Sequence, residues 1–166
     1  MSVIVLPGSP DSVFQFRLTK SLKKGSVFTA GKAKYKVTKA DVSGLAEVQF
    51  KAPGSKKYSS VTIPNTVKYK GITYKVTSIA DKAFQKNKKL KKVTIGVNVT
   101  KIGKAAFYRA KKLKKIVLKT QKLNTIGSKA FKKIHKKAVF YIPKSVRKVY
   151  KVKLLKAGAS KKCKFK

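Results

Sequence analysis

The fold of this chain is decided by the word Ile102-Gly103-Lys104-Ala105-Ala106-Phe107, which is followed by the run Leu113-Lys114-Lys115-Ile116-Val117-Leu118. The first word occurs twice more, as Ile79-Ala80-Asp81-Lys82-Ala83-Phe84 and as Ile126-Gly127-Ser128-Lys129-Ala130-Phe131. Its copies lie 23 and 24 residues apart. A fixed period of this length gives one supersecondary unit per repeat, and such units bury their apolar faces by stacking on their neighbours. The sequence therefore predicts a solenoid.

Each copy also carries an alternating apolar pair, nine and eleven residues after its phenylalanine. Alternation over a short run indicates a half-buried strand. Together with the repeated isoleucines and phenylalanines, these pairs give the predicted repeat core: Ile79, Phe84, Val93, Ile95, Ile102, Phe107, Ile116, Leu118, Ile126, Phe131, Phe140 and Ile142.

The run Leu90-Lys91-Lys92-Val93-Thr94-Ile95 and its copy at residues 113–118 fit the L-x-x-L-x-L frame of leucine-rich repeats. With the I-G-x-x-A-F words, they closely resemble the BspA-like, or Treponema-type, leucine-rich repeat of bacterial surface proteins. The resemblance implies a mostly β, right-handed solenoid with one or two short strands and a turn or short helix per repeat. It also implies an extracellular or cell-surface location and a role in adhesion. Many relatives place a cysteine three residues after the phenylalanine, but here Asn87, Ala110 and Ile134 stand there, so we expect no ladder of sulfur atoms.

The rest of the chain predicts flanking parts. We expect a linker at 1–24, a small antiparallel β module at 25–57 that ends near Pro53-Gly54-Ser55, and a helix-strand cap at 146–166. The repeats between them comprise a partial unit and three full units, at 58–75, 76–98, 99–122 and 123–145. In the cap, apolar residues at near-helical spacing and a closing Gly158 predict a helix over Ser145–Ala157. The apolar positions are Val146, Val149, Tyr150, Leu154 and Leu155.

Positive charge dominates the composition. The formal net charge is +40, from 44 lysines and arginines against four acids. Lysine pairs recur before or within successive strands, so stacking predicts basic columns, formed by Lys91, Lys114, Lys136 and Lys137. Two readings remain open: a solvated lysine face that keeps an edge-rich β protein from pairing with itself, or a surface that binds an anionic partner.

Two functions follow as hypotheses. The first is a non-enzymatic module that binds a host or bacterial surface protein, or an anionic glycan, through the outward residues of its strands. By period-two geometry, these residues are Lys92, Thr94, Lys115, Val117, Val139 and Tyr141. The second is an electrostatic anchor to anionic envelope polymers of the teichoic acid type, without a specific ligand. Binding of a specific nucleic acid sequence is not expected, because lysine dominates over arginine and no RNA- or DNA-binding motif occurs.

Catalytic chemistry is not expected. The acids Asp11, Asp41, Glu47 and Asp81 fall in different elements, so paired carboxylates are not predicted. The single histidine, His135, fits a surface turn. We expect no cofactor and no metal. The single cysteine, Cys163, alternates with Phe165 in an expected strand and fits a buried structural residue, although flanking lysines leave a reactive thiol as an alternative. No run reaches the roughly 18 apolar residues of a membrane span, and residues 1–6 do not resemble a signal peptide.

Overall fold

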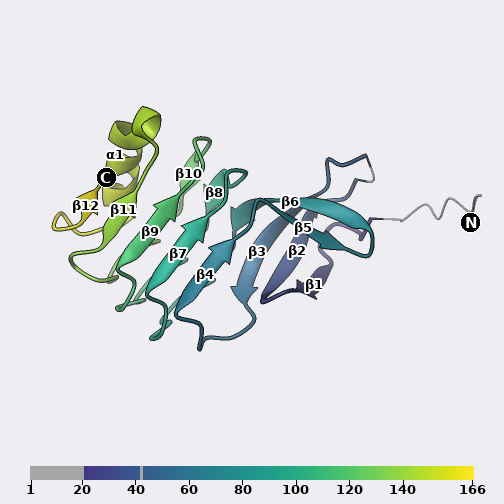
Figure 1. Ribbon diagram of the computed structural model, residues 1–166, viewed down its shortest axis with the longest axis horizontal. Coiled ribbons are helices and arrows are strands. Elements are labelled where there is room, and N and C mark those ends of the chain that lie inside the picture. The colour runs from purple at the N-terminus through teal and green to yellow at the C-terminus, as the bar shows by residue number, and fades with distance from the viewer. Residues whose placement is uncertain (1–20, 42) are drawn as a thin grey trace, which may run out of the picture.

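The computed structural model describes residues 21–41 and 43–166. The described chain is built mainly of short strands, with one helical segment near its C-terminus (Figure 1). The elements are β1 (Val27–Ala30), β2 (Ala33–Lys39), β3 (Glu47–Pro53), β4 (Ser60–Ile63), β5 (Thr66–Tyr69), β6 (Ile72–Ile79), β7 (Lys92–Ile95), β8 (Lys101–Ile102), β9 (Lys115–Leu118), β10 (Thr125–Ile126), β11 (Val139–Tyr141), a 3-10 turn (Lys144–Val146), α1 (Arg147–Lys156) and β12 (Lys164–Phe165).

The strands form two sheets that run along the stack of repeats. The five-stranded sheet has the order β12-β11-β9-β7-β4, and every neighbouring pair in it is parallel. The seven-stranded sheet has the order β1-β2-β3-β6-β8-β10, with β5 also paired to β6. Each repeat contributes one strand to each sheet, so the chain coils as it advances. This arrangement confirms the predicted leucine-rich-repeat solenoid and its helix-strand cap.

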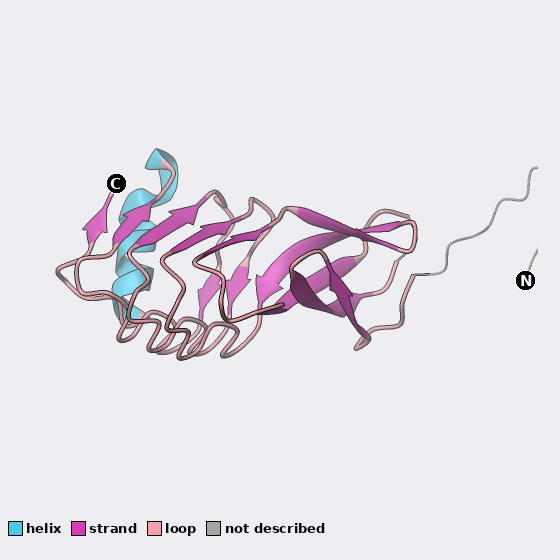
Figure 2. Ribbon diagram, turned by 60° about the horizontal axis from the view of Figure 1, so that its bottom comes forward, coloured by secondary structure: helices cyan, strands magenta, loops and turns pink. Residues whose placement is uncertain are grey.

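A layer of turns closes the third side of the coil. We call residues 80–91, 103–114 and 127–138 the turn layer; its loops lie side by side beneath the strands in Figure 2. Its backbone is bonded from repeat to repeat: Phe84 N–H donates to Ala106 O at 2.7 Å, and Phe107 N–H donates to Ala130 O at 2.8 Å. Successive repeats are therefore held by hydrogen bonds on all three sides, not in the sheets alone.

The turn layer uses left-handed backbone at the same place in each repeat. Lys86, Arg109 and Lys133 have φ angles of 56°, 61° and 62°. Side chains with a branched Cβ tolerate this region poorly, whereas asparagine enters it at little cost.

Replacing Lys86, which is exposed, tests this backbone requirement. We expect Lys86→Val to lower the free energy of unfolding by about 1–2 kcal/mol, and Lys86→Asn to change it by about 0.5 kcal/mol or less. Urea unfolding measures both. Lys88→Val, at an exposed neighbour outside the left-handed region, is the control, and an equal loss there would assign the effect to the valine side chain instead of the backbone.

Aromatic rings form a continuous spine through the core. Phe50 stacks on Phe84 with ring centroids 5.4 Å apart, Phe84 on Phe107 at 4.9 Å, and Phe107 on Phe131 at 5.1 Å. Phe131 then meets Phe140 edge to face at 5.3 Å. The spine gives each repeat a large apolar contact with the next and ties the repeats into one core.

Eleven of the twelve residues predicted for the repeat core are buried in the structure, and Ile126 is only half-buried. Ile126 lies on β10, the last strand of the seven-stranded sheet, so no further strand of the described residues covers its outer side. Ile79 and Ile102, the corresponding residues of the earlier repeats, each have a strand on both sides. In the third repeat, both Ile134 and Ala138 are buried around the position where leucine stands in the other two.

The expected β module is continuous with the repeats. Strands β1, β2 and β3 are antiparallel as predicted, but β3 then pairs in parallel with β6 of the first repeat. Phe50 of β3 is the first phenylalanine of the stack with Phe84. The structure therefore shows no break in sheet or core at Pro53, where the sequence predicted a boundary. Strand β4 follows that proline and pairs in parallel with β7, so it extends the other sheet.

Helix α1 begins after a 3-10 turn and ends at Lys156, and the turn that follows it contains Gly158. Gly158 has φ 94°; its N–H donates to Leu155 O, and Ala159 N–H donates to Leu154 O, both at 3.0 Å. These two bonds satisfy carbonyls at the helix end, as in a Schellman cap. Tyr150 and Leu154 are buried, whereas Val149, predicted for the apolar face, is 55% exposed, because the helix packs through a narrower stripe than its sequence suggested.

Candidate interaction surface

The six outward residues predicted from the strands lie in two rows across the outer face of the five-stranded sheet. Pairing aligns Lys92 with Lys115 and Lys115 with Val139 in one row. It aligns Thr94 with Val117 and Val117 with Tyr141 in the other. We call these six residues the outer rows: Lys92, Thr94, Lys115, Val117, Val139 and Tyr141. Adjacent strands are about 4.8 Å apart, so the rows form one continuous patch.

The outer rows combine charge with apolar surface. Lys92 and Lys115 are exposed, while the other four side chains are half-buried. The Lys115 ammonium lies 4.9 Å from the centroid of the Tyr141 ring, in a cation–π contact between neighbouring strands. Such a contact is worth about 0.5–1 kcal/mol at an exposed site. The patch therefore presents a cation beside an aromatic ring.

The lysine columns differ from those predicted. Lys91 and Lys114 are both exposed. They are neighbours in adjacent repeats, since Lys114 N–H donates to Lys91 O at 2.9 Å. Val139 N–H donates to Lys114 O at 2.8 Å, so the next residue in this column is Ala138, which is buried. Lys136 and Lys137 precede it, in the turn layer. The predicted column was wrong for the third repeat. The 24-residue spacing places Lys137 at the position of Leu113, and Ala138 at the position of Lys114.

The turn layer carries a basic column that was not predicted, because the predicted columns were placed before or within the strands. Lys86, Arg109 and Lys133 are exposed and recur at the repeat period. Their backbones are linked, since Lys86 N–H donates to Tyr108 O at 2.8 Å and Arg109 N–H donates to Lys132 O at 3.1 Å. The 23- and 24-residue spacing of these positions was visible in the sequence and would have found the column. Positive charge therefore lies on the turn layer as well as on the strands.

Asp11 lies outside the described residues, and the other three acids all have hydrogen-bond partners. The Asp41 carboxylate accepts the Ser43 N–H at 2.7 Å and the Ser43 hydroxyl at 2.6 Å. The Asp81 carboxylate accepts the Lys104 N–H of the next repeat at 2.7 Å. The Glu47 carboxylate accepts the Thr77 hydroxyl at 3.1 Å. His135 lies at a turn, where its Nδ1 accepts the Lys137 N–H at 3.2 Å. In residues 21–41 and 43–166, no three His, Cys, Asp or Glu side chains form a group that could hold a metal ion.

Cys163 is 7% exposed, and its burial raises the pKa of the thiol. The thiolate is the reactive form, so both burial and the raised pKa slow alkylation. We expect the native chain to react with a thiol reagent at about pH 8 at least about tenfold more slowly than the chain unfolded in guanidinium. Equal rates would show that Cys163 is accessible and would revive the reactive-thiol alternative.

The stacked parallel strands, the turn layer and the aromatic spine define a leucine-rich-repeat protein. The model of the BspA type leucine rich repeat region matches residues 46–153 with six copies. The chain therefore belongs to the BspA-type leucine-rich-repeat family, as the sequence predicted. The matched region begins at residue 46 and so includes β3, in agreement with the continuity of the sheet.

Solved structures of bacterial proteins show the same fold. A leucine-rich repeat protein from Bacteroides capillosus superposes with a TM-score of 0.55 and 26% identity, over 72% of this chain and 84% of that one. A leucine rich cell surface protein from Faecalibacterium prausnitzii superposes with a TM-score of 0.54 and 23% identity. That match covers 75% of this chain but only 35% of the Faecalibacterium protein. No curated protein matches the chain.

Leucine-rich repeats of this family are generally non-enzymatic interaction folds. In the part of the chain that the structure describes, no helix is long and apolar enough to cross a bilayer.

Proposed function

We propose that this chain is a non-enzymatic interaction module of a bacterial cell-surface or secreted protein, and that it binds a protein or an anionic glycan through the outer rows. Family membership supports the interaction role, and the Faecalibacterium relative supports the location, because it is a cell surface protein. Adhesion to host tissue or to other cells is the role that this placement favours.

The observation that carries the proposed site is the register of the outer rows. A partner that lies across the five-stranded sheet would meet cations at Lys92 and Lys115 and apolar surface at Val117 and Tyr141. Interfaces of this mixed kind are typical of protein recognition, in which aromatic residues and cations anchor a partially apolar patch. The contact of the Lys115 ammonium with the Tyr141 ring at 4.9 Å supports this choice of site, because it places a cation and an aromatic group side by side on the sheet.

The variant that tests this site combines Lys92→Ser, Lys115→Ser and Tyr141→Ser. Binding to fibronectin, heparin and teichoic acid is measured at about 50 and about 300 mM salt, a range over which purely charge-driven binding falls steeply. We expect at least one ligand to remain bound at the higher salt and to lose about tenfold in affinity, or about 1.4 kcal/mol, in the variant.

A matched control carries the same chemical changes on other faces, as Lys101→Ser, Lys104→Ser and Tyr108→Ser. Circular dichroism verifies the fold of both variants. If the two variants lose the same affinity, the outer rows are not the site.

The second candidate is an electrostatic anchor to anionic envelope polymers. Its support is the net charge of +40 together with a basic column on the turn layer, so that cations cover more than one face. Binding of every polyanion at the lower salt and of none at the higher salt would favour this anchor and remove the support for a specific partner.

A further inference from the structure

Strand β12 is the last strand of the five-stranded sheet, and no strand among residues 21–41 and 43–166 pairs with its outer side. Lys164 N–H donates to Ala138 O at 2.9 Å, and Lys166 N–H donates to Phe140 O at 2.8 Å. Both bonds point to β11, and successive residues of a strand direct their backbone groups to opposite sides. The N–H and C=O of Phe165 therefore point away from the sheet, toward the space where a sixth strand would lie.

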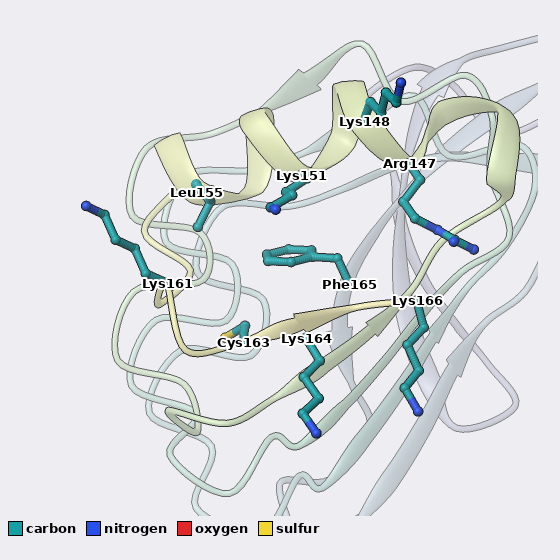
Figure 3. Close-up of a pocket in the computed structure, with 9 residues that line it drawn as sticks. All are labelled: Arg147, Lys148, Lys151, Leu155, Lys161, Cys163, Lys164, Phe165 and Lys166. Carbon is teal, nitrogen blue, oxygen red and sulfur yellow. The ribbon is translucent and has the colours of Figure 1, made fainter.

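A cleft of about 790 Å³ adjoins this edge, between β12 and α1. Six cationic side chains line it and no acidic side chain does: Arg147, Lys148, Lys151, Lys161, Lys164 and Lys166. Figure 3 shows Arg147, Lys148 and Lys151 on the helix side and Lys161, Lys164 and Lys166 on the side of β12; the side chains of Lys148, Lys164 and Lys166 extend outward from these elements, away from the Phe165 ring. An anion entering the cleft would be attracted from both walls.

The floor of the cleft is apolar. Phe165 projects into the space between the helix and the strand, with Leu155 beside it (Figure 3). One face of the Phe165 ring stacks on Phe140, with centroids 5.3 Å apart, and the ring as a whole is half-buried. The aromatic spine thus ends in the cleft with a ring that no further aromatic residue covers, although the Lys151 ammonium lies 5.8 Å from the centroid of the Phe165 ring.

Arg147 makes one weak side-chain hydrogen bond beside the cleft. Its Nη2 donates to Ile142 O at 3.4 Å, which is a long bond. Its Nε is buried and has no hydrogen-bond partner among the described residues. A ligand in the cleft would therefore not reach the Nε, and Arg147 contributes its positive charge to the wall of the cleft.

We propose that an acidic, extended polypeptide segment docks in this cleft as an added strand beside β12. Its backbone would pair with the free groups of Phe165, as in other cases of strand addition. Its apolar side chains would cover the Phe165 ring on the inner face of the sheet, and its carboxylates would lie on the outer face beside Lys164 and Lys166, within the positive field of the other four cations. A strand with alternating acidic and apolar residues satisfies both requirements, because successive side chains point to opposite faces.

Other occupants fit less well. A polyphosphate or sulfated glycan would neutralise the cations, but it would neither pair with the Phe165 backbone nor cover its ring. A second copy of this chain would bring the same net charge of +40, and charge repulsion opposes that contact. Lys164 is next to Val139 in the sheet and so adjoins the outer rows. The variant tested below leaves Lys164 unchanged, so the proposal can fail without affecting the proposed function.

The test uses the full chain and a fluorescent peptide, Glu-Val-Glu-Val-Glu-Val, with binding followed by fluorescence anisotropy at about 100 mM salt, where exposed charges are screened beyond about 10 Å. We expect saturable binding that weakens at least about tenfold in the variant Lys148→Ser, Lys151→Ser, Lys161→Ser. These three lysines are exposed, so the fold should survive, and circular dichroism verifies it.

The matched control protein carries Lys89→Ser, Lys111→Ser and Lys112→Ser, which remove the same charge from exposed positions of the turn layer. We expect it to retain affinity within about twofold. A peptide with its central valines N-methylated keeps its charge but loses backbone donors, and we expect it to bind at least about tenfold more weakly. Strand addition would be overturned if the two protein variants weakened binding equally. It would also be overturned if polyphosphate or the methylated peptide bound as tightly as the unmodified peptide. Either result would leave a general polyanion surface.

Discussion

Phe107→Ala is expected to lower the free energy of unfolding by about 4 kcal/mol, the middle of the range for truncating a buried phenylalanine. Phe107 is fully buried and lies in the middle of the spine, with stacked rings on both sides: Phe84 at 4.9 Å with planes 7° apart, and Phe131 at 5.1 Å with planes 10° apart. Alanine removes both ring contacts and leaves a cavity between repeats. Since small domains are stable by about 5–15 kcal/mol, a large part of the stability would be lost.

Urea or thermal unfolding measures this loss, and Phe107→Leu should recover more than half of it, because leucine refills most of the volume. Tyr108→Ala is the control, since Tyr108 is the next residue of the same turn but is only half-buried. We expect it to cost about 1 kcal/mol or less. A loss in Tyr108→Ala as large as that in Phe107→Ala would assign the effect to the turn and not to the aromatic spine.

Gly103→Ala is expected to destabilise the chain by about 3 kcal/mol, by forcing two backbones apart. A Cβ on Gly103 would stand 2.6 Å from the carbonyl carbon of Ala80 and 2.5 Å from the Asp81 carboxylate. Gly127 repeats the contact one repeat later, where a Cβ would stand 2.6 Å from the carbonyl carbon of Gly103. Backbone in this layer is bonded on both sides, as by the 2.9 Å bond from Gly103 N–H to Ile79 O, so it cannot yield at low cost.

The chain offers its own control for this prediction. The first repeat has Ala80 at the position of Gly103 and Gly127, and a Cβ is therefore already accommodated where the repeat meets β3. We expect Ala80→Gly to cost about 1 kcal/mol or less, from backbone entropy. Unfolding midpoints in urea compare the two variants, and Gly103→Ala with wild-type stability would show that the repeats can separate by a few tenths of an ångström without penalty.

The repeats of this protein could be predicted from its sequence because each one has apolar residues at the same spacing. The spacing of Ile102 and Phe107 from their copies gives both the register of the strands and the buried face. Gly158 predicted the end of the helix, because the residue that follows a helix often adopts a left-handed backbone conformation, which favours glycine. The outward positions followed from alternation alone, and the structure places them in two aligned rows.

The sequence did not predict the features at the two ends of the stack, where the repeats meet the N-terminal strands or the C-terminal cap. Phe50 continues the aromatic spine from a strand and not from a turn, so no I-G-x-x-A-F word marks it. Ile126 keeps the pattern of its copies, but it lies on an edge strand. The cleft beside Phe165 combines a helix, a strand edge and six cations, and no local pattern predicts how those elements face one another.

The hydrogen-bonded turn layer has a consequence for how such a protein can change its length. Because a middle repeat is bonded to its immediate neighbours on three sides, a duplicated copy of residues 99–122 has, on either side, surfaces shaped for a repeat. Each duplication would add one more cation to the row that contains Lys115 and one more ring to the spine. The valency of the surface toward a long partner would then rise stepwise by gene duplication, and avidity would rise with it, without any new kind of contact.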